Sequence, residues 1–99
     1  MPQPPVVIVG SGIAGLWTAL HAAPLPVVLL AGNSLGGDSS TGWAQGGIAA
    51  ALGDSDSPAL HAADTIAAGA GLADEAAARL LAESAPDEVR ALEALGVSF

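Results

Sequence analysis

The sequence predicts an α/β protein that begins with a Rossmann-like βαβ unit. Three observations support this prediction: a β-branched run at residues 6–9, a glycine-rich turn followed by a helical repeat, and an apolar run at residues 27–30. Short apolar runs without polar alternation are typical of strands buried on both faces of a parallel sheet. Because two strands make too small a sheet, we expect an incomplete part of a larger doubly wound domain.

The βαβ unit is expected at about residues 6–31. Its helix is indicated by apolar residues spaced as on one helix face: Ile13, Leu16, Trp17 and Leu20. Two prolines then end the helix, since proline disrupts a helix interior. A connection of this kind between parallel strands is right-handed.

The rest of the chain is expected to hold a loop and then helices. Residues 31–43 are rich in small polar residues and predict a loop, and residues 44–52 predict a short helix. We assign residues 32–47 as a loop and residues 58–95 as a helical region, so that residues 1–99 form part of one domain.

Three helices are expected within residues 58–95. The first begins at Pro58, a residue type favoured in the first turn, and the second covers residues 73–82. A capping box at Ser84 and Asp87 predicts the start of the third, and Gly96 predicts its end. Residues 97–99 are then expected to begin a strand.

The charge balance excludes several classes of partner. Ten acidic residues face two arginines and no lysine, which gives a net charge of −8. Nucleic acids and anionic membrane surfaces attract cationic proteins, so neither is an expected partner. The first five residues lack the basic side chain of a signal peptide, and no apolar stretch is long enough for a membrane span. We therefore expect a cytoplasmic protein.

A glycine-rich loop follows the first predicted strand and matches the pattern G-x-G-x-x-G. Its residues are Gly10, Ser11, Gly12, Ile13, Ala14 and Gly15. Between a strand and a helix, this pattern predicts a dinucleotide site. The first glycine permits the tight turn, the second lets a pyrophosphate approach the backbone, and the third lets helix and strand pack closely.

One part of the common dinucleotide site is missing. An acidic residue that binds the ribose is expected about 20 residues after the loop. In its place the chain has Asn33 and Ser34, so an ordinary NAD-dependent dehydrogenase is disfavoured. Asn33 is the candidate for the ribose contact, with Ser34 as the alternative.

A second motif indicates which cofactor is bound. It runs from Ser39 to Ala50, and its candidate cofactor-binding residues are Ser40, Thr41, Gly42, Trp43, Ala44, Gln45, Gly46 and Gly47. Hydroxyls, an amide and paired glycines suit the packing of backbone against a flat ligand. The segment resembles the S-T-x-x-A-Q-G-G-I-A-A stretch of the succinate dehydrogenase, fumarate reductase and aspartate oxidase flavoproteins. The later Asp64-Thr65-Ile66-Ala67-Ala68-Gly69-Ala70-Gly71 is similar to a segment of the aspartate oxidases.

This resemblance implies several properties. The loop at about residues 32–47 contacts the flavin, and residues 1–99 are part of an FAD-binding domain. Ser40 stands where succinate dehydrogenases and fumarate reductases carry the histidine that holds FAD covalently, which implies non-covalent FAD. The implied reaction oxidises L-aspartate to iminoaspartate, with oxygen or fumarate as the electron acceptor. Iminoaspartate then feeds quinolinate synthase in NAD biosynthesis. A soluble fumarate reductase with unlinked flavin, a non-catalytic nucleotide-binding module and an inert fragment remain alternatives.

No catalytic residue and no metal site are predicted within these 99 residues. Substrate carboxylates require cations, and Arg79 and Arg90 fall on helix positions that read as solvent-exposed. Neither His21 nor His61 has a partner at metal-ligand spacing. The chain alone is therefore expected to be inactive.

Overall fold

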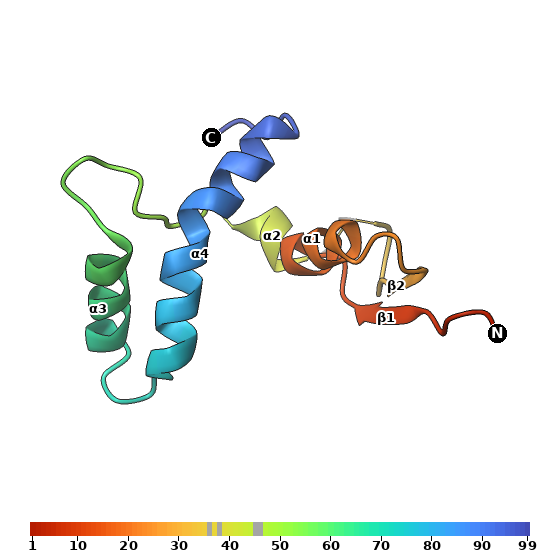
Figure 1. The fold of residues 1–99 in the computed structure, drawn as a ribbon, viewed down its shortest axis with the longest axis horizontal. Helices are drawn as coiled ribbons and strands as arrows, with labels where there is room; N and C mark the ends of the chain where they lie inside the picture. Colours follow the sequence, from red (N-terminus) through yellow and green to blue (C-terminus); the bar gives the residue numbers. More distant parts are fainter. Residues whose placement is uncertain (36, 38, 45–46) are drawn as a thin grey trace. The chain divides into compact units, whose positions relative to one another are not determined.

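The computed structural model describes residues 1–35, 37, 39–44 and 47–99. The chain divides into two compact units, Met1–Gly46 and Gly47–Phe99, and each is described by itself. The first unit contains β1, α1, β2 and α2, and the second contains α3 and α4 (Figure 1).

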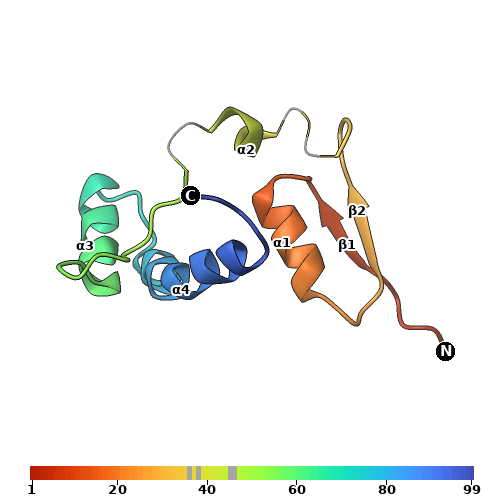
Figure 2. The same ribbon diagram turned by 90° about the horizontal axis from the view of Figure 1, so that it is seen from above.

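The first unit is a βαβ arrangement, as predicted. Strand β1 (Val6–Val9) pairs in parallel with β2 (Val27–Leu30), and Ile8 lies opposite Leu29. Helix α1 (Ile13–His21) connects the strands and lies against one face of the sheet (Figure 2). This parallel pair confirms the α/β class, and the doubly wound domain remains a prediction.

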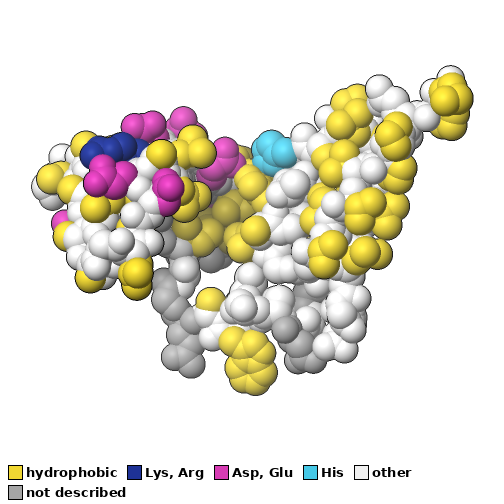
Figure 3. Space-filling model, turned by 90° about the horizontal axis from the view of Figure 1, so that it is seen from below, with side chains coloured by type: hydrophobic (Ala, Val, Ile, Leu, Met, Phe, Trp, Pro, Cys, Tyr) yellow, Lys and Arg dark blue, Asp and Glu magenta, His cyan; other side chains and the backbone are white. Residues whose placement is uncertain are grey.

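The sheet has one covered face and one bare face. On β1, Ile8 is buried beside α1, whereas Val7 and Val9 on the opposite face are 58% and 81% exposed. On β2, Val28 and Leu30 continue the bare face. Hydrophobic side chains accordingly gather over the strands in Figure 3. Apolar side chains on both faces are typical of a strand that is buried on both faces in a complete parallel sheet.

Two glycines allow α1 to begin beside the end of β1. Gly10 has a φ of +111°, a conformation that L side chains rarely adopt. A Cβ atom on Gly15 would overlap the carbonyl oxygen of Gly10. The turn and the first helical turn are therefore in backbone contact, as the third glycine of the motif predicts.

The second unit is a helical hairpin in which α3 (Pro58–Ala68) lies beside the first half of α4 (Glu75–Ala94) (Figure 1). Side chains cap both helices: Ser57 Oγ accepts a hydrogen bond from Leu60 N at 3.2 Å, and Asp74 Oδ1 accepts one from Ala77 N at 2.8 Å. The small core of this unit contains Ala51, Ala62, Ala78, Ala82, Val89 and Leu92.

The prediction of two separate helices after residue 73 is wrong, because α4 is continuous and contains Pro86. Ser84 does not cap a helix; its hydroxyl donates to the Leu80 carbonyl at 2.8 Å. Buried side chains before and after Pro86, such as Ala82 and Val89, belong to one helix. This shared burial outweighs the hydrogen bond that proline removes.

The region after β2 also differs from the prediction. A one-turn helix, α2 (Ser40–Trp43), lies inside the predicted loop, and Ser39 caps it by accepting from Gly42 N at 3.4 Å. The predicted helix over 44–52 is wrong, because residues 44 and 47–52 are not helical. Gly47 has a φ of +76°, which a right-handed helix cannot contain.

The end of α4 confirms Gly96 as a stop signal. Its φ is +97°, its N–H donates to Glu93 O at 2.9 Å, and Val97 N donates to Leu92 O at 3.2 Å. These two bonds form a Schellman motif. The expected strand over 97–99 is wrong, because Val97 is used to close the helix and the following residues are not extended against a partner.

We predict that Gly15→Ala in the full-length protein lowers the free energy of unfolding by about 2–4 kcal/mol, since the new methyl group must displace backbone. Urea denaturation measures this change. Gly32→Ala is the control, because its Cβ would meet nothing within 4 Å. Equal stability of the two variants would contradict the backbone contact.

Candidate functional site

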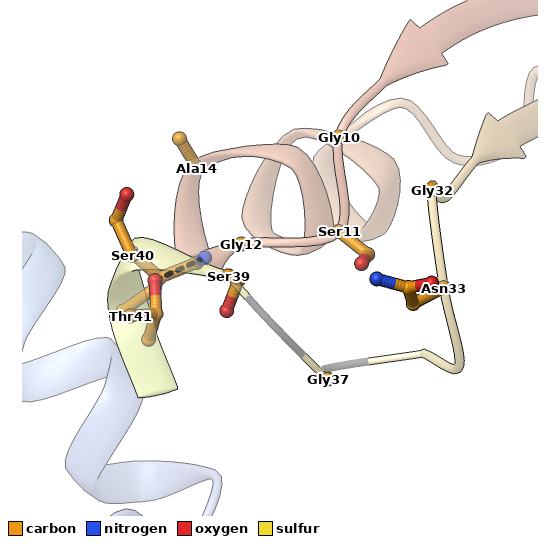
Figure 4. A pocket seen from close by; sticks show the side chains of 11 residues that line it. Gly10, Ser11, Gly12, Ala14, Gly32, Asn33, Gly37, Ser39, Ser40 and Thr41 are labelled. Atoms are coloured by element: carbon orange, nitrogen blue, oxygen red, sulfur yellow. Dashed lines mark hydrogen bonds between the residues drawn. The ribbon is translucent and has the colours of Figure 1, made fainter. Parts of the chain in front are cut away.

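A pocket of about 470 Å³ opens in the first unit, where β1 and β2 end and α1 begins (Figure 4). The carboxyl ends of parallel strands share one edge of a sheet, which is where α/β folds bind ligands. The lining residues are Gly10, Ser11, Gly12, Ile13, Ala14, Gly32, Asn33, Gly37, Ser39, Ser40 and Thr41.

The glycine loop forms one wall of this pocket. The first hydrogen bond of α1 runs from Leu16 N to Gly12 O at 3.0 Å, so the backbone N–H groups before Leu16 have no acceptor within the helix. Gly12 is the N-cap and provides no side-chain acceptor. Free N–H groups and the positive end of the helix dipole make this wall suitable for a phosphate.

The second motif supplies the opposite wall. The Ile13 N–H donates to Thr41 Oγ1 at 3.0 Å, across a sequence separation of 28 residues (Figure 4). A hydroxyl that accepts this bond keeps its own proton for another acceptor. The structure therefore brings the glycine loop and the segment around Thr41 to one site, although they are distant in sequence.

Gly12 lies where the two walls meet. A Cβ atom at this position would lie 3.3 Å from Thr41 Oγ1 and 3.8 Å from Ser39 Cβ. The absence of a side chain thus leaves room both for the second motif and for a ligand that approaches the loop.

The pocket has no charged lining residue among those that the structure describes. Anion binding there depends on backbone N–H groups, on hydroxyls and on the dipole of α1. Ser11 is 8% exposed, and the side chain of Asn33 points toward it (Figure 4). These neutral polar groups fit the phosphates and ribose of a dinucleotide.

The predicted site residues fall into three groups. Eight line the pocket: Gly10, Ser11, Gly12, Ile13, Ala14, Asn33, Ser40 and Thr41. Gly15 packs under the loop, and Gly42, Trp43 and Ala44 do not line the pocket. Gln45 and Gly46 lie outside the described residues, and Gly47 belongs to the second unit. The contacts of all these residues with FAD remain predictions.

Three pocket residues lie in the predicted loop of residues 32–47 but were not named as cofactor-binding residues: Gly32, Gly37 and Ser39. Gly32 lies two residues after the end of β2. Because the ends of parallel strands meet at one edge of a sheet, this position could have been predicted. Ser39 is the first residue of the second motif and caps α2.

In the part of the chain that the structure describes, no three His, Cys, Asp or Glu residues gather as metal ligands. Nδ1 of His21 lies 3.0 Å from the Trp17 carbonyl oxygen, and the Trp17 and His21 rings are tilted by 56° with centroids 4.4 Å apart. Over the same described residues, no helix combines the length and apolar character needed to cross a membrane.

A family model described as an FAD binding domain matches residues 5–99. The chain belongs to this family of FAD-binding domains. FAD is therefore its cofactor. That FAD binds in the pocket at the glycine loop remains a prediction: backbone N–H groups at the start of α1 would hold its phosphates there, and the missing side chain of Gly12 would leave their approach open.

Curated relatives of this FAD-binding chain carry the name L-aspartate oxidase. The chain is 60% identical to the one from Mesorhizobium japonicum and 56% identical to the one from Agrobacterium fabrum, each over 94% of its length. It is 52% identical to the one from Streptomyces coelicolor over 95% of its length. The chain spans 16–18% of the length of these relatives.

We predict that Gly12→Val in the full-length protein weakens FAD binding on the order of a hundredfold, because the side chain fills the space between the two walls. Fluorescence titration with FAD measures the affinity. Gly53→Val is the matched control, since a Cβ there meets nothing within 4 Å and Gly53 lies outside the pocket. Native affinity in Gly12→Val would remove Gly12 from the cofactor site.

Proposed function

We propose that this chain is the amino-terminal FAD-binding part of a flavoenzyme that oxidises L-aspartate to iminoaspartate. The observation that carries the proposal is the 60% identity to an L-aspartate oxidase over 93 residues, a stretch that includes both motifs of the pocket. Identity of this extent applies to the cofactor-binding part, so the substrate is inferred from the relatives.

In this proposal the chain binds and orients the cofactor. Backbone N–H groups at the start of α1 hold the pyrophosphate, Asn33 binds the adenosine ribose, and residues 40–47 lie along the flavin. Bound FAD supplies the oxidising group that accepts a hydride equivalent from the substrate. The groups that hold the substrate carboxylates and manage the amino proton come from other parts of the enzyme.

The wider reaction follows from the same inference. Oxygen or fumarate takes the electrons, and iminoaspartate passes to quinolinate synthase in NAD biosynthesis. The low content of cations and the absence of a spanning helix among the described residues are compatible with a cytoplasmic enzyme. A soluble fumarate reductase is the second candidate, because it shares the second motif; reduction of the flavin by L-aspartate separates the two.

The arginines of this chain are proposed to take no part in the chemistry. Arg79 pairs with Glu75 at 3.9 Å and Arg90 with Asp87 at 2.9 Å, and the arginine side chains are 56% and 62% exposed. Each pair lies within one exposed helix face and contributes little to stability. Both arginines belong to α4, outside the unit that contains the pocket.

We predict that the full-length protein purifies with flavin absorption that L-aspartate bleaches under anaerobic conditions. Arg79→Ala and Arg90→Ala should each leave kcat/KM for L-aspartate within about threefold, whereas loss of a transition-state contact costs ~10²-fold or more. Flavin that succinate reduces and L-aspartate does not would favour the second candidate. A hundredfold loss in either arginine variant with FAD still bound would place catalytic function in α4.

We predict non-covalent FAD, because position 40 is a serine that offers no imidazole for attachment. Precipitation of the holoprotein with acid should release all of the yellow colour to the supernatant. Introducing the missing side chain, Ser40→His, tests whether the position alone directs attachment. Flavin that stays with the pellet of the unmodified protein contradicts the prediction.

A further inference from the structure

Helix α1 has no local side-chain cap at its amino terminus. Its N-cap is Gly12, which provides no side-chain hydrogen bond, whereas α3 and α4 are capped locally by Ser57 and Asp74. A side chain at position 12 would meet the second wall of the pocket, since a Cβ atom there would lie 3.3 Å from Thr41 Oγ1. A side-chain acceptor for the first turn of α1 must therefore come from elsewhere in the chain.

Thr41 supplies that acceptor. Its Oγ1 accepts the Ile13 N–H at 3.0 Å, across a sequence separation of 28 residues (Figure 4). Ile13 is the first residue of α1, so Thr41 satisfies one of the N–H groups that the helix itself leaves without an acceptor. The Ile13 N–H is thus used within the protein and is not available to a phosphate.

The same hydrogen bond ties residues 39–44 to the glycine loop. Among the described residues, the other hydrogen bonds of this segment are local: Gly42 N donates to Ser39 O at 3.0 Å and to Ser39 Oγ at 3.4 Å, and Ala44 N donates to Thr41 O at 3.4 Å. A helix of a single turn, such as α2, is not stable by itself. The Thr41 hydroxyl is therefore the polar link that keeps α2 against the loop.

We propose that Thr41 is a positioning residue that couples the two halves of the cofactor site. It caps α1 from a distance, and by the same bond it holds α2 where the flavin half of the cofactor binds. The inference rests on the proposed function, because Ser40–Trp43 are taken there as contacts of the flavin. The phosphate half binds at N–H groups other than that of Ile13 and does not need the Thr41 hydroxyl.

This coupling predicts different effects on two ligands. ADP contains the adenosine and pyrophosphate of FAD but no flavin, so its affinity reports on the glycine loop alone. In the full-length apoprotein, Thr41→Val preserves the shape of the side chain and removes the hydroxyl. It should weaken FAD binding about five- to tenfold, the effect of one lost hydrogen bond, and leave ADP binding within about twofold. Thr41→Ser retains the hydroxyl and should bind both ligands like the unmodified protein. Isothermal titration calorimetry measures both affinities.

Thr18→Val is the matched control. Thr18 also lies on α1, and its hydroxyl donates to Ala14 O at 2.7 Å, so the same chemical change is made outside the pocket lining. It should leave both affinities unchanged. Equal weakening of ADP and FAD in Thr41→Val would indicate a direct phosphate contact or a general loss of structure, and unchanged FAD binding would mean that the bond couples nothing. Either result overturns the proposal, as does failure of ADP to bind the unmodified protein.

Failure of the proposed function gives a different pattern. If the unmodified protein binds ADP but not FAD, the flavin assignment is wrong. Hydrogen exchange then still tests the cap, because the Ile13 amide should exchange faster in Thr41→Val than in Thr41→Ser. If FAD binds and the Ile13 amide exchanges equally in both variants, the role of Thr41 alone is wrong.

Discussion

The backbone contact between Gly15 and Gly10 is the constraint on which the cofactor site depends. Because position 15 has no side chain, the first turn of α1 lies directly against the turn that leaves β1. That contact aims the free N–H groups of the helix at the edge where both strands end. Thr41 then reaches the same helix end, so the second wall of the pocket is positioned by the first.

The electrostatics of the chain make this backbone arrangement more important. With a net charge of −8 and a neutral pocket lining, the described residues offer an anion no cationic side chain at the site. Helix dipole and N–H groups remain, and they act over a short range at fixed positions. Such a site depends on geometry more than on total charge, and therefore on glycine at positions 10, 12 and 15.

The sequence predicted those parts of the fold that local patterns determine. Both strands, α1, the start of α3 and the stop at Gly96 follow from β-branched runs, helical periodicity, a favourable proline and a positive-φ glycine. Tertiary burial decided the rest, since α4 continues through Pro86 and has buried side chains on both sides of it. In the pocket, the glycine loop could be predicted from the spacing of its glycines. The hydrogen bond between Ile13 and Thr41 could not, because these residues are 28 positions apart and meet only in the folded chain.

The two units make different demands on the same short connecting sequence. Ser40 and Thr41 line the pocket in the first unit, while Ala51 is buried in the core of the second. Gly47, with a φ of +76°, lies between them and provides a bend that other residues rarely adopt.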